Sequence, residues 1–331
     1  MARKKVAIAQ IDGKLPNLAL MKLSAWHKSQ GDEVAFFLPS ESYDLVYASK
    51  VFTFSADDPY LPQRVVKGGT GYNVVAALPD EVEHIYPDYE MWGINYAIGF
   101  ASRGCVRNCP WCVVPRKEGK IKANADIYEF WRGQDELVLL DGNITALPDH
   151  FKLICEQIMR ENIRVEFNQG LDIRCVDADM AKLISPLRLR TNLRFGFDSS
   201  VYGDAVERGV KLLQSSGVSK NKLMFYLLYN FNDTPQDLYE RLVLLQRLGV
   251  DAYPMRYRAL DGKEEGRNSG WNSFQLDGFS RLVRQHSWGR MVVFGRMGLE
   301  RFYSIFGNSE QEFVGRIGAE GRYCEKQMRL S

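Results

Sequence analysis

Short apolar runs alternate with amphipathic stretches through the middle of this 331-residue chain. Each run has the length and the branched or aromatic content of a buried strand, and the stretches between them repeat apolar residues at helical spacing. Strands that alternate with helices build parallel sheets, because the helix returns the chain to the start of the next strand. The sequence therefore predicts an α/β fold. The predicted strands after residue 95 are Tyr96–Phe100, Leu137–Leu140, Val165–Phe167, Leu193–Asp198, Leu223–Leu228 and Asp251–Arg258.

The first ninety residues predict a smaller open parallel sheet of their own. Lys5–Ile11 is a buried strand by its apolar content, a helical stretch follows over Leu15–Gln30, and Glu33–Leu38 gives a second strand. A third strand region is predicted over Leu45–Ala48 and Val51–Phe54. We expect residues 1–90 to form one domain, which a linker over residues 78–92 joins to the next.

Three of the six cysteines, Cys105, Cys109 and Cys112, lie within eight residues directly after the strand predicted at Tyr96–Phe100. One compact loop can turn the three thiolates toward a common point at the carboxyl end of that strand, where parallel α/β folds keep their active sites. Thiolates suit iron–sulfur clusters, which normally take four cysteines. A cluster with three protein ligands would leave one iron open to a small molecule. Zinc or a disulfide is the alternative, although structural zinc sites usually draw their ligands as two spaced pairs.

The spacing of these cysteines, with Trp111 just before the last of them, resembles the cluster loop of the radical S-adenosylmethionine (radical SAM) enzymes. The resemblance implies a [4Fe–4S] cluster on the three cysteines, with the fourth iron chelated by SAM. It further implies reductive cleavage of SAM to a 5′-deoxyadenosyl radical that takes hydrogen from a substrate, and a reducing partner such as flavodoxin or ferredoxin. The strand–helix units over residues 92–262 resemble the partial, TIM-like (β/α)6 barrel of that family.

The resemblance also implies where SAM binds. Asp141, Gly142 and Asn143 follow the second strand of the barrel, where the family carries the small-residue motif that receives the SAM ammonium group. They match that motif by position and by residue type, and they depart from its common Gly-Gly-Glu form.

Polar side chains also follow the later strands. The cluster after the third strand suits ribose hydroxyls through Asn168, Gln169 and Asp172, and Arg174 suits the methionine carboxylate because a guanidinium pairs with it through two hydrogen bonds. Loop capping is the alternative for this cluster. The further residues expected at the cofactor are Trp111, Asp198 and Asn230. The sequence assigns no residue a catalytic role.

The N-terminal sheet resembles the flavodoxin-like domain of the cobalamin-binding branch of radical SAM enzymes. Members that ligate cobalt through histidine carry Asp-x-His-x-x-Gly in the first loop, whereas Asp12 here is followed by Gly13 and Lys14. His27 is expected at a surface or edge, so cobalamin is possible but not favoured. Gly68–Gly71 can cradle an anion, but it lacks the spacing of known nucleotide loops, and we favour a tight turn.

A C-terminal extension, residues 263–331, departs from the repeating pattern and predicts an amphipathic helix over Phe274–His286. From Arg281 onward it holds eight arginines and one lysine against five acidic residues, interleaved with aromatic side chains. This mixture suits nucleic acid through phosphates and base stacking, and it is also typical of a helical lid over a barrel. We favour the lid, because the excess charge is modest. Cys155 is expected in the core, and Cys175 and Cys324 are isolated.

The sequence predicts a cytoplasmic protein that is not bound to a membrane. Its longest apolar runs fall short of the roughly eighteen residues of a membrane helix, and its apolar start is too short for a signal peptide. The substrate stays open between a small molecule and a nucleic acid. The alternatives are a cobalamin-dependent radical SAM methyltransferase, a radical SAM enzyme that modifies nucleic-acid bases, a barrel with a structural cluster only, and a non-catalytic protein that binds metal and nucleic acid.

Overall fold

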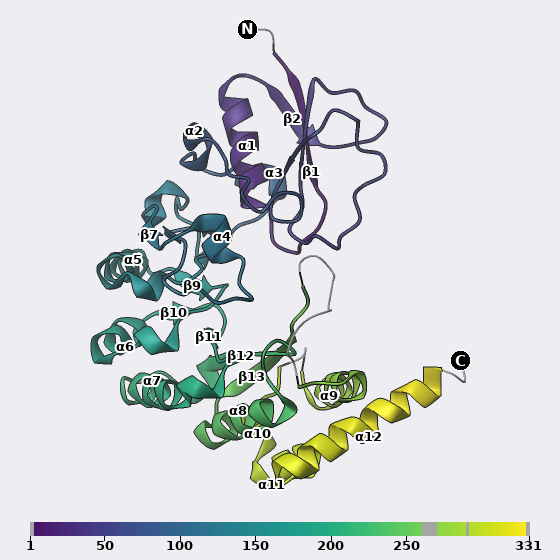
Figure 1. The fold of residues 1–331 in the computed structure, drawn as a ribbon. Coiled ribbons are helices and arrows are strands. Elements are labelled where there is room, and N and C mark those ends of the chain that lie inside the picture. Colours follow the sequence, from purple (N-terminus) through teal and green to yellow (C-terminus); the bar gives the residue numbers. More distant parts are fainter. Residues whose placement is uncertain (1–2, 260–269, 289–290, 329–331) are drawn as a thin grey trace. The chain divides into compact units, whose positions relative to one another are not determined.

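The computed structural model describes residues 3–259, 270–288 and 291–328, without the side chains of residues 295, 296 and 323–328. The chain divides into two compact units, the first built mainly from residues 1–169 and the second mainly from residues 170–331 (Figure 1). The predicted boundary at residue 262 and the side chain of Cys324 lie outside the described residues. The predicted separation of the first ninety residues as a domain stays a prediction.

A four-stranded parallel sheet opens the first unit, as the sequence predicts. Its strands, in the spatial order β2-β1-β3-β4, are β1 (Lys5–Gln10), β2 (Glu33–Phe36), β3 (Leu45–Ser49) and β4 (Val66–Gly68). Helix α1 (Leu18–Ser29) connects β1 to β2 and begins where the Asn17 side chain accepts a hydrogen bond from the Leu20 N–H. Residues 6–8 of β1 are buried, so the core of this sheet forms around β1 (Figure 1).

The segment after β3 is a loop, so the prediction that Val51–Phe54 continues a strand is wrong. The Asp12 carboxylate accepts hydrogen bonds from the N–H groups of Val51 and Phe52, at 2.7 and 2.9 Å. A carboxylate 39 residues away thus satisfies backbone donors that a strand would pair with its neighbour. The local sequence pattern carries no sign of this partner.

Strand β4 was not predicted, and it ends in the tight turn that was favoured for Gly68–Gly71. Gly69 has a φ of 86°, and a Cβ atom added there would lie 2.5 Å from the carbonyl oxygen of Lys50. Only glycine fits a left-handed position in such close contact with another backbone segment. The turn is therefore packed against the carboxyl end of β3.

The segment predicted as a linker contains the short helices α2 (Asp80–Glu83) and α3 (Tyr89–Trp92). The Tyr89 hydroxyl donates to the carbonyl of Phe130 at 2.6 Å and accepts from the N–H of Ile98 at 3.1 Å. Both bonds are buried. This segment is consequently packed structure rather than a flexible connection.

The remaining parallel strands of the first unit are β5 (Ala97–Gly99), β8 (Glu136–Leu139) and β9 (Arg164–Phe167), in the order β5-β8-β9. The antiparallel pair β6 (Ser102–Arg103) and β7 (Lys122–Ala123) follows β5. The helices are α4 (Val114–Glu118) and α5 (Pro148–Arg160), with single 3-10 turns at Ile127–Glu129 and Ile144–Ala146. The sequence predicts a helix over Ile127–Arg132, but only the 3-10 turn forms. Cys155 on α5 is fully buried, as predicted.

The second unit contains the parallel strands β11 (Leu193–Gly196), β12 (Leu223–Tyr229) and β13 (Asp251–Arg256), in this spatial order. Its helices are α6 (Ala178–Ile184), α7 (Gly203–Ser215) and α8 (Pro235–Leu248), and it also holds the two-residue strand β10 (Arg188–Leu189). Short 3-10 turns lie at Ile173–Cys175, Ser200–Tyr202 and Lys220–Lys222. Each of the six strands predicted after residue 95 is present, and the α/β class with parallel sheets is confirmed.

The C-terminal extension is helical, with α9 (Ser273–His286), α10 (Phe294–Met297), α11 (Leu299–Phe306) and α12 (Glu310–Met328). Helices α9 and α12 approach closely at Gly278, where an added Cβ atom would lie 1.7 Å from the carbonyl oxygen of Ile317. The helical content agrees with the predicted extension, and its role as a lid or as a nucleic-acid face stays open. Among the described helices, none combines the length and the apolar character that crossing a membrane requires.

Candidate functional site

The three neighbouring cysteines lie on the cysteine loop, residues 104–113, which leaves β6 and leads into α4. The loop begins at Gly104, whose φ is 82° and where an added Cβ atom would lie 2.4 Å from the carbonyl oxygen of Lys120. The Cys105 N–H donates to the carbonyl of Gly119 at 3.2 Å. Together with the pairing of β6 and β7, these contacts close the base of the loop at the carboxyl side of β5.

Cys105 and Cys109 are half-buried and Cys112 is exposed. The Cys112 N–H donates to the Cys109 carbonyl at 3.0 Å, and the Arg107 N–H donates to the Cys105 sulfur at 3.3 Å. Within the described part of the chain, no three cysteine, histidine or acidic side chains converge as the ligands of a single metal ion. A cubane cluster does not need that convergence, because each thiolate binds a different iron.

Asp141, at the end of β8, binds the backbone that leads into the cysteine loop. It is 3% exposed, and its carboxylate accepts hydrogen bonds from the Ser102 hydroxyl at 2.6 Å, from the Ser102 N–H, and from the Ala101 N–H at 3.3 Å. Burial raises the pKa of Asp141 to about 6, although these donors favour its charged form. Asp141 therefore fixes the position of the start of the loop.

The next two residues of the predicted Asp-Gly-Asn segment contact the cysteine loop itself. A Cβ atom added at Gly142 would lie 3.4 Å from the Gly104 carbonyl oxygen. The side-chain amide nitrogen of Asn143 lies 3.6 Å from the Cys105 sulfur. The structure thus brings this segment and the cysteines together, as the barrel topology implies.

Asn168 and Gln169 follow β9 in the same unit. Asn168 is half-buried and its N–H donates to the carbonyl of Leu139 at 2.9 Å, whereas Gln169 is exposed. Trp111 is half-buried within the cysteine loop. The roles of these three side chains at a cofactor stay predictions.

The second unit holds the other predicted contacts. Arg174 pairs with Asp172 through two hydrogen bonds, at 2.7 and 3.1 Å, and its guanidinium lies 4.7 Å from the centre of the Tyr202 ring. The Asp172 side chain also caps the 3-10 turn that begins at Ile173. The Arg174 guanidinium, which was predicted to bind the SAM carboxylate, is thus bound to the carboxylate of Asp172 in this structure.

Asp198 and Asn230 lie after β11 and β12. Asp198 accepts a hydrogen bond from the Leu228 N–H at 3.0 Å, and burial raises the pKa of its carboxyl group. Asn230 has a φ of 67°, and its N–H donates to the Asp233 carboxylate at 2.8 Å. Both residues are therefore held by hydrogen bonds to the backbone or side chains at the ends of these strands.

The sequence analysis missed Arg241, which is fully buried on α8. Its guanidinium donates to the carbonyls of Phe197 and Leu228, each at 2.9 Å, and to the Asp233 carboxylate at 2.8 Å. It joins the carboxyl ends of β11 and β12, because both carbonyls lie there. An arginine on an amphipathic helix ordinarily suggests a solvated face, so the sequence offers no signal for this role.

Two contacts between the first ninety residues and the segments that flank the cysteine loop were also not predicted. Glu83 of α2 pairs with Arg103, which precedes the loop, at 2.6 Å, and with the buried Lys22 of α1 at 3.3 Å. Lys117 of α4, which follows the loop, donates to the Thr70 hydroxyl at 2.6 Å. Burial lowers the pKa of Lys117. Both flanks of the cysteine loop are thus bonded to residues of the first ninety.

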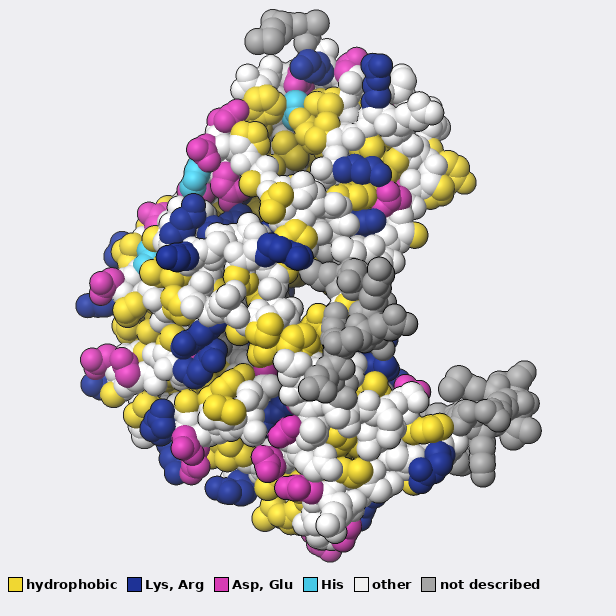
Figure 2. Space-filling model, viewed as in Figure 1, with side chains coloured by type: hydrophobic (Ala, Val, Ile, Leu, Met, Phe, Trp, Pro, Cys, Tyr) yellow, Lys and Arg dark blue, Asp and Glu magenta, His cyan; other side chains and the backbone are white. Residues whose placement is uncertain are grey.

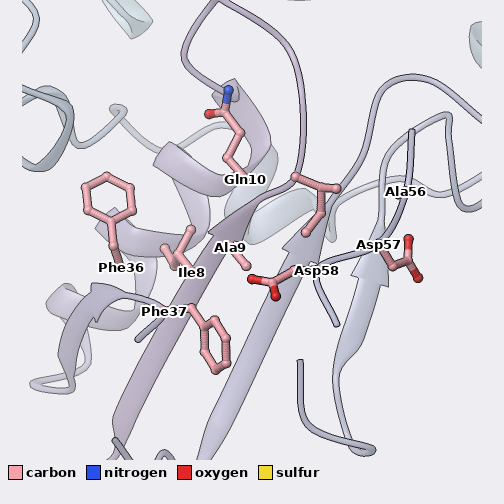
Figure 3. A pocket seen from close by; sticks show the side chains of 9 residues that line it. Ile8, Ala9, Gln10, Phe36, Phe37, Ala56, Asp57 and Asp58 are labelled. Carbon is pink, nitrogen blue, oxygen red and sulfur yellow. The ribbon is translucent and has the colours of Figure 1, made fainter. Parts of the chain in front are cut away.

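A hollow of about 570 Å³ opens in the N-terminal sheet region. Its lining residues come from the ends of β1 and β2 and from the loop after β3: Ile8, Ala9, Gln10, Ile11, Phe36, Phe37, Ala56, Asp57 and Asp58 (Figure 3). Asp57 pairs with Lys50 and Lys67, at 2.7 and 2.8 Å. Ligands of open parallel sheets bind at the carboxyl ends of strands, so this is a candidate binding site.

Aromatic side chains reach the surface on the loop after β3. Phe52 is 42% and Phe54 is 66% exposed, and their rings stack with centres 5.2 Å apart. Apolar side chains are visible at the surface of this unit in the space-filling view (Figure 2).

His27 is not the surface or edge residue that the sequence predicts. It is 2% exposed, one ring nitrogen lies 2.7 Å from the Asp32 carboxylate, and the other lies 3.1 Å from the Tyr47 hydroxyl. Because both nitrogens have partners on neighbouring elements of the first unit, His27 acts as a core residue of α1.

A scan against models of protein families and a search of curated proteins each found no match for this chain. Among solved structures, it is similar to TsrM from Kitasatospora setae, a radical S-adenosylmethionine methyltransferase solved with cobalamin and a [4Fe–4S] cluster bound. The TM-score is 0.58 at 12% identity, over 87% of this chain and 80% of that chain. OxsB, a cobalamin-dependent S-adenosylmethionine radical enzyme solved with aqua-cobalamin and S-adenosylmethionine, gives a TM-score of 0.48 at 12% identity over 74% of this chain and 52% of that chain. The fold of this chain is therefore similar to that of TsrM over most of its length.

Proposed function

We propose that this chain is a radical SAM enzyme whose Cys105, Cys109 and Cys112 hold a [4Fe–4S] cluster. The observation that carries the proposal is the placement of three cysteines on one loop at the carboxyl side of β5, beside the segment that follows β8. The fold similarity to TsrM supports it. Bound to this loop, the cluster would supply the electron that cleaves SAM to methionine and a 5′-deoxyadenosyl radical.

The residues around the loop fit that cofactor. Three thiols match the soft-ligand preference of iron–sulfur clusters and leave one iron for SAM. The Arg107 N–H and the Asn143 amide supply hydrogen-bond donors to the Cys105 sulfur, which will carry negative charge as a ligand. Asp141 holds the backbone at residues 101 and 102, and so orients the loop that presents the thiols. Metal ligands generally depend on such supporting contacts.

Anaerobic reconstitution with iron and sulfide, followed by dithionite and SAM, tests the proposal. The wild-type chain should gain a broad visible absorption and produce 5′-deoxyadenosine. Cys105→Ala should lose both, whereas Cys155→Ala, the matched control on α5, should keep its iron and its product. A chain that assembles a cluster but yields no 5′-deoxyadenosine has a structural cluster only. Full iron and full activity in Cys105→Ala would refute the assignment of the site.

A cobalamin-dependent methyl transfer is the second candidate, and the hollow at the ends of β1 and β2 favours it. The structure of TsrM, whose fold is similar, was solved with cobalamin bound. The loop after β1 has no histidine, and both ring nitrogens of His27 have partners in the core. In this second candidate, cobalamin would therefore bind without a histidine ligand to cobalt. Titration with hydroxocobalamin, followed by absorption, tests it: saturable binding supports this branch, and no binding leaves the radical SAM proposal without the corrin.

The proposal also includes an electron-donating partner and a cellular compartment. Reduction of the cluster requires a one-electron donor such as flavodoxin or ferredoxin, and free thiols persist in a reducing compartment such as the cytoplasm. The substrate is a small molecule or a nucleic acid. Candidate substrates can be compared by whether each transfers one hydrogen atom to 5′-deoxyadenosine.

A further inference from the structure

Asn143 makes a side-chain contact with one of the three cysteines. Asn143 is 3% exposed, and its side-chain amide nitrogen lies 3.6 Å from the Cys105 sulfur, within hydrogen-bond range for sulfur. The same sulfur accepts the Arg107 N–H at 3.3 Å. Cys105 is therefore held between a backbone donor of its own loop and a side-chain donor from the end of β8.

Thr145 binds the opposite end of the same amide. Its hydroxyl donates to the side-chain oxygen of Asn143 at 2.9 Å, and Thr145 is itself 2% exposed. Because the oxygen end of the amide accepts that bond, the NH₂ end is the one that lies toward Cys105. Thr145 follows Asn143 by two residues on the 3-10 turn Ile144–Ala146, so the orientation is built into the local chain.

We propose that Asn143, oriented by Thr145, sets the reduction potential of the cluster, in addition to any contact with SAM. The inference rests on the proposed function. An external one-electron reductant adds one electron to the oxidised cluster, and no bond forms or breaks. The added negative charge spreads to the ligand sulfurs, so an N–H donor stabilises the reduced form more than the oxidised form. Removing the donor makes the cluster harder to reduce.

Three variants measured without SAM isolate this effect. Asn143→Ala removes the donor, Thr145→Val removes the group that orients it while leaving the amide in place, and Thr145→Ser is the conservative control that keeps the hydroxyl. Each reconstituted protein is titrated with dithionite and followed by electron paramagnetic resonance, and its iron and sulfide contents are measured. Leaving out SAM separates the donor role from a contact between Asn143 and SAM.

At a fixed applied potential the ratio of reduced to oxidised cluster should fall about tenfold in Asn143→Ala, which is about 59 mV for a one-electron couple. Thr145→Val should shift in the same direction by less, and Thr145→Ser should match the wild type. Unchanged potentials in Asn143→Ala and Thr145→Val overturn the inference. If Asn143→Ala fails to assemble a cluster, Thr145→Val decides it alone.

The two proposals fail in different ways. Shifted potentials without 5′-deoxyadenosine would refute the enzyme and keep the role of Asn143. Normal SAM cleavage with unshifted potentials would keep the enzyme and refute the role of Asn143. A wild-type chain that assembles no cluster refutes both.

Discussion

Replacing Asp141 with asparagine should change how the stability of the first unit depends on pH. The buried carboxyl group faces three donors from residues 101 and 102, and burial nonetheless raises its pKa to about 6. Asparagine has the same shape and can still accept the Ser102 bonds through its oxygen. Its NH₂ end would face the Ala101 N–H, a cost that does not vary with pH.

The sign follows from which state binds the proton more tightly. The folded protein holds the Asp141 proton to about pH 6, whereas the unfolded chain releases it near the ordinary value of 3.8. The contribution of Asp141 to stability is therefore complete below pH 3.8 and is lost as pH rises through 6. A shift of about two pKa units corresponds to about 3 kcal/mol, at about 1.4 kcal/mol per unit.

Urea unfolding of the wild type and of Asp141→Asn, followed by tryptophan fluorescence at a series of pH values, measures this contribution. The difference in unfolding free energy between the two proteins cancels the other carboxyl groups. Between about pH 4 and pH 7 that difference should change by about 3 kcal/mol, in the direction that favours asparagine at the higher pH. A flat difference would mean that Asp141 ionises normally. A change of the opposite sign would mean that the three donors outweigh burial.

Three further outcomes follow from the contacts described above. Arg174 would have to leave Asp172 in order to bind the SAM carboxylate; if it does so, Arg174→Ala should weaken SAM binding in equilibrium dialysis more than it lowers iron content, and an unchanged affinity would show that the SAM carboxylate is held elsewhere. Gly69→Ala should lower the free energy of unfolding by about 1–3 kcal/mol in urea, because an added Cβ atom would lie 2.5 Å from the Lys50 carbonyl oxygen; a smaller loss contradicts the close contact. If cobalamin binds, His27→Ala should leave the corrin spectrum unchanged, and a shifted spectrum would identify the imidazole as a ligand.

Periodicity predicted the strands well because their burial is visible locally. The runs at residues 137–140 and 223–228 are continuous apolar stretches, and they form strands β8 and β12 within one or two residues of the expected bounds. The elements that were misjudged depend on partners far along the chain. Val51–Phe54 has strand-like composition, yet the Asp12 carboxylate takes two of its backbone donors. Within the predicted linker, residues 78–92, the Tyr89 hydroxyl binds the backbone of two other segments, and the composition of the segment does not reveal this packing.

The candidate site shows the same division. The cysteines and the Asp-Gly-Asn segment could be placed next to each other from strand order alone, because neighbouring parallel strands end at one edge. The partner of each side chain could not be predicted. Asp141 binds the backbone N–H groups of Ala101 and Ser102, which lie 40 and 39 residues earlier, and Arg174 pairs with Asp172. Such choices depend on side-chain geometry, which residue spacing does not encode.

The bonds on both flanks of the cysteine loop limit how far the first ninety residues can be treated as an exchangeable module. Arg103 and Lys117 find their partners, Glu83 and Thr70, on the other side of residue 90. A chain shortened to begin there would leave Arg103 with Glu118 but without Glu83, and Lys117 without the Thr70 hydroxyl. Partly buried charges that lose partners are costly. An unrelated domain grafted in their place would have to supply an acidic group and a hydroxyl at matching positions. Recombination among chains of this fold should therefore succeed when the exchanged segment extends past Lys117 rather than ending at residue 90.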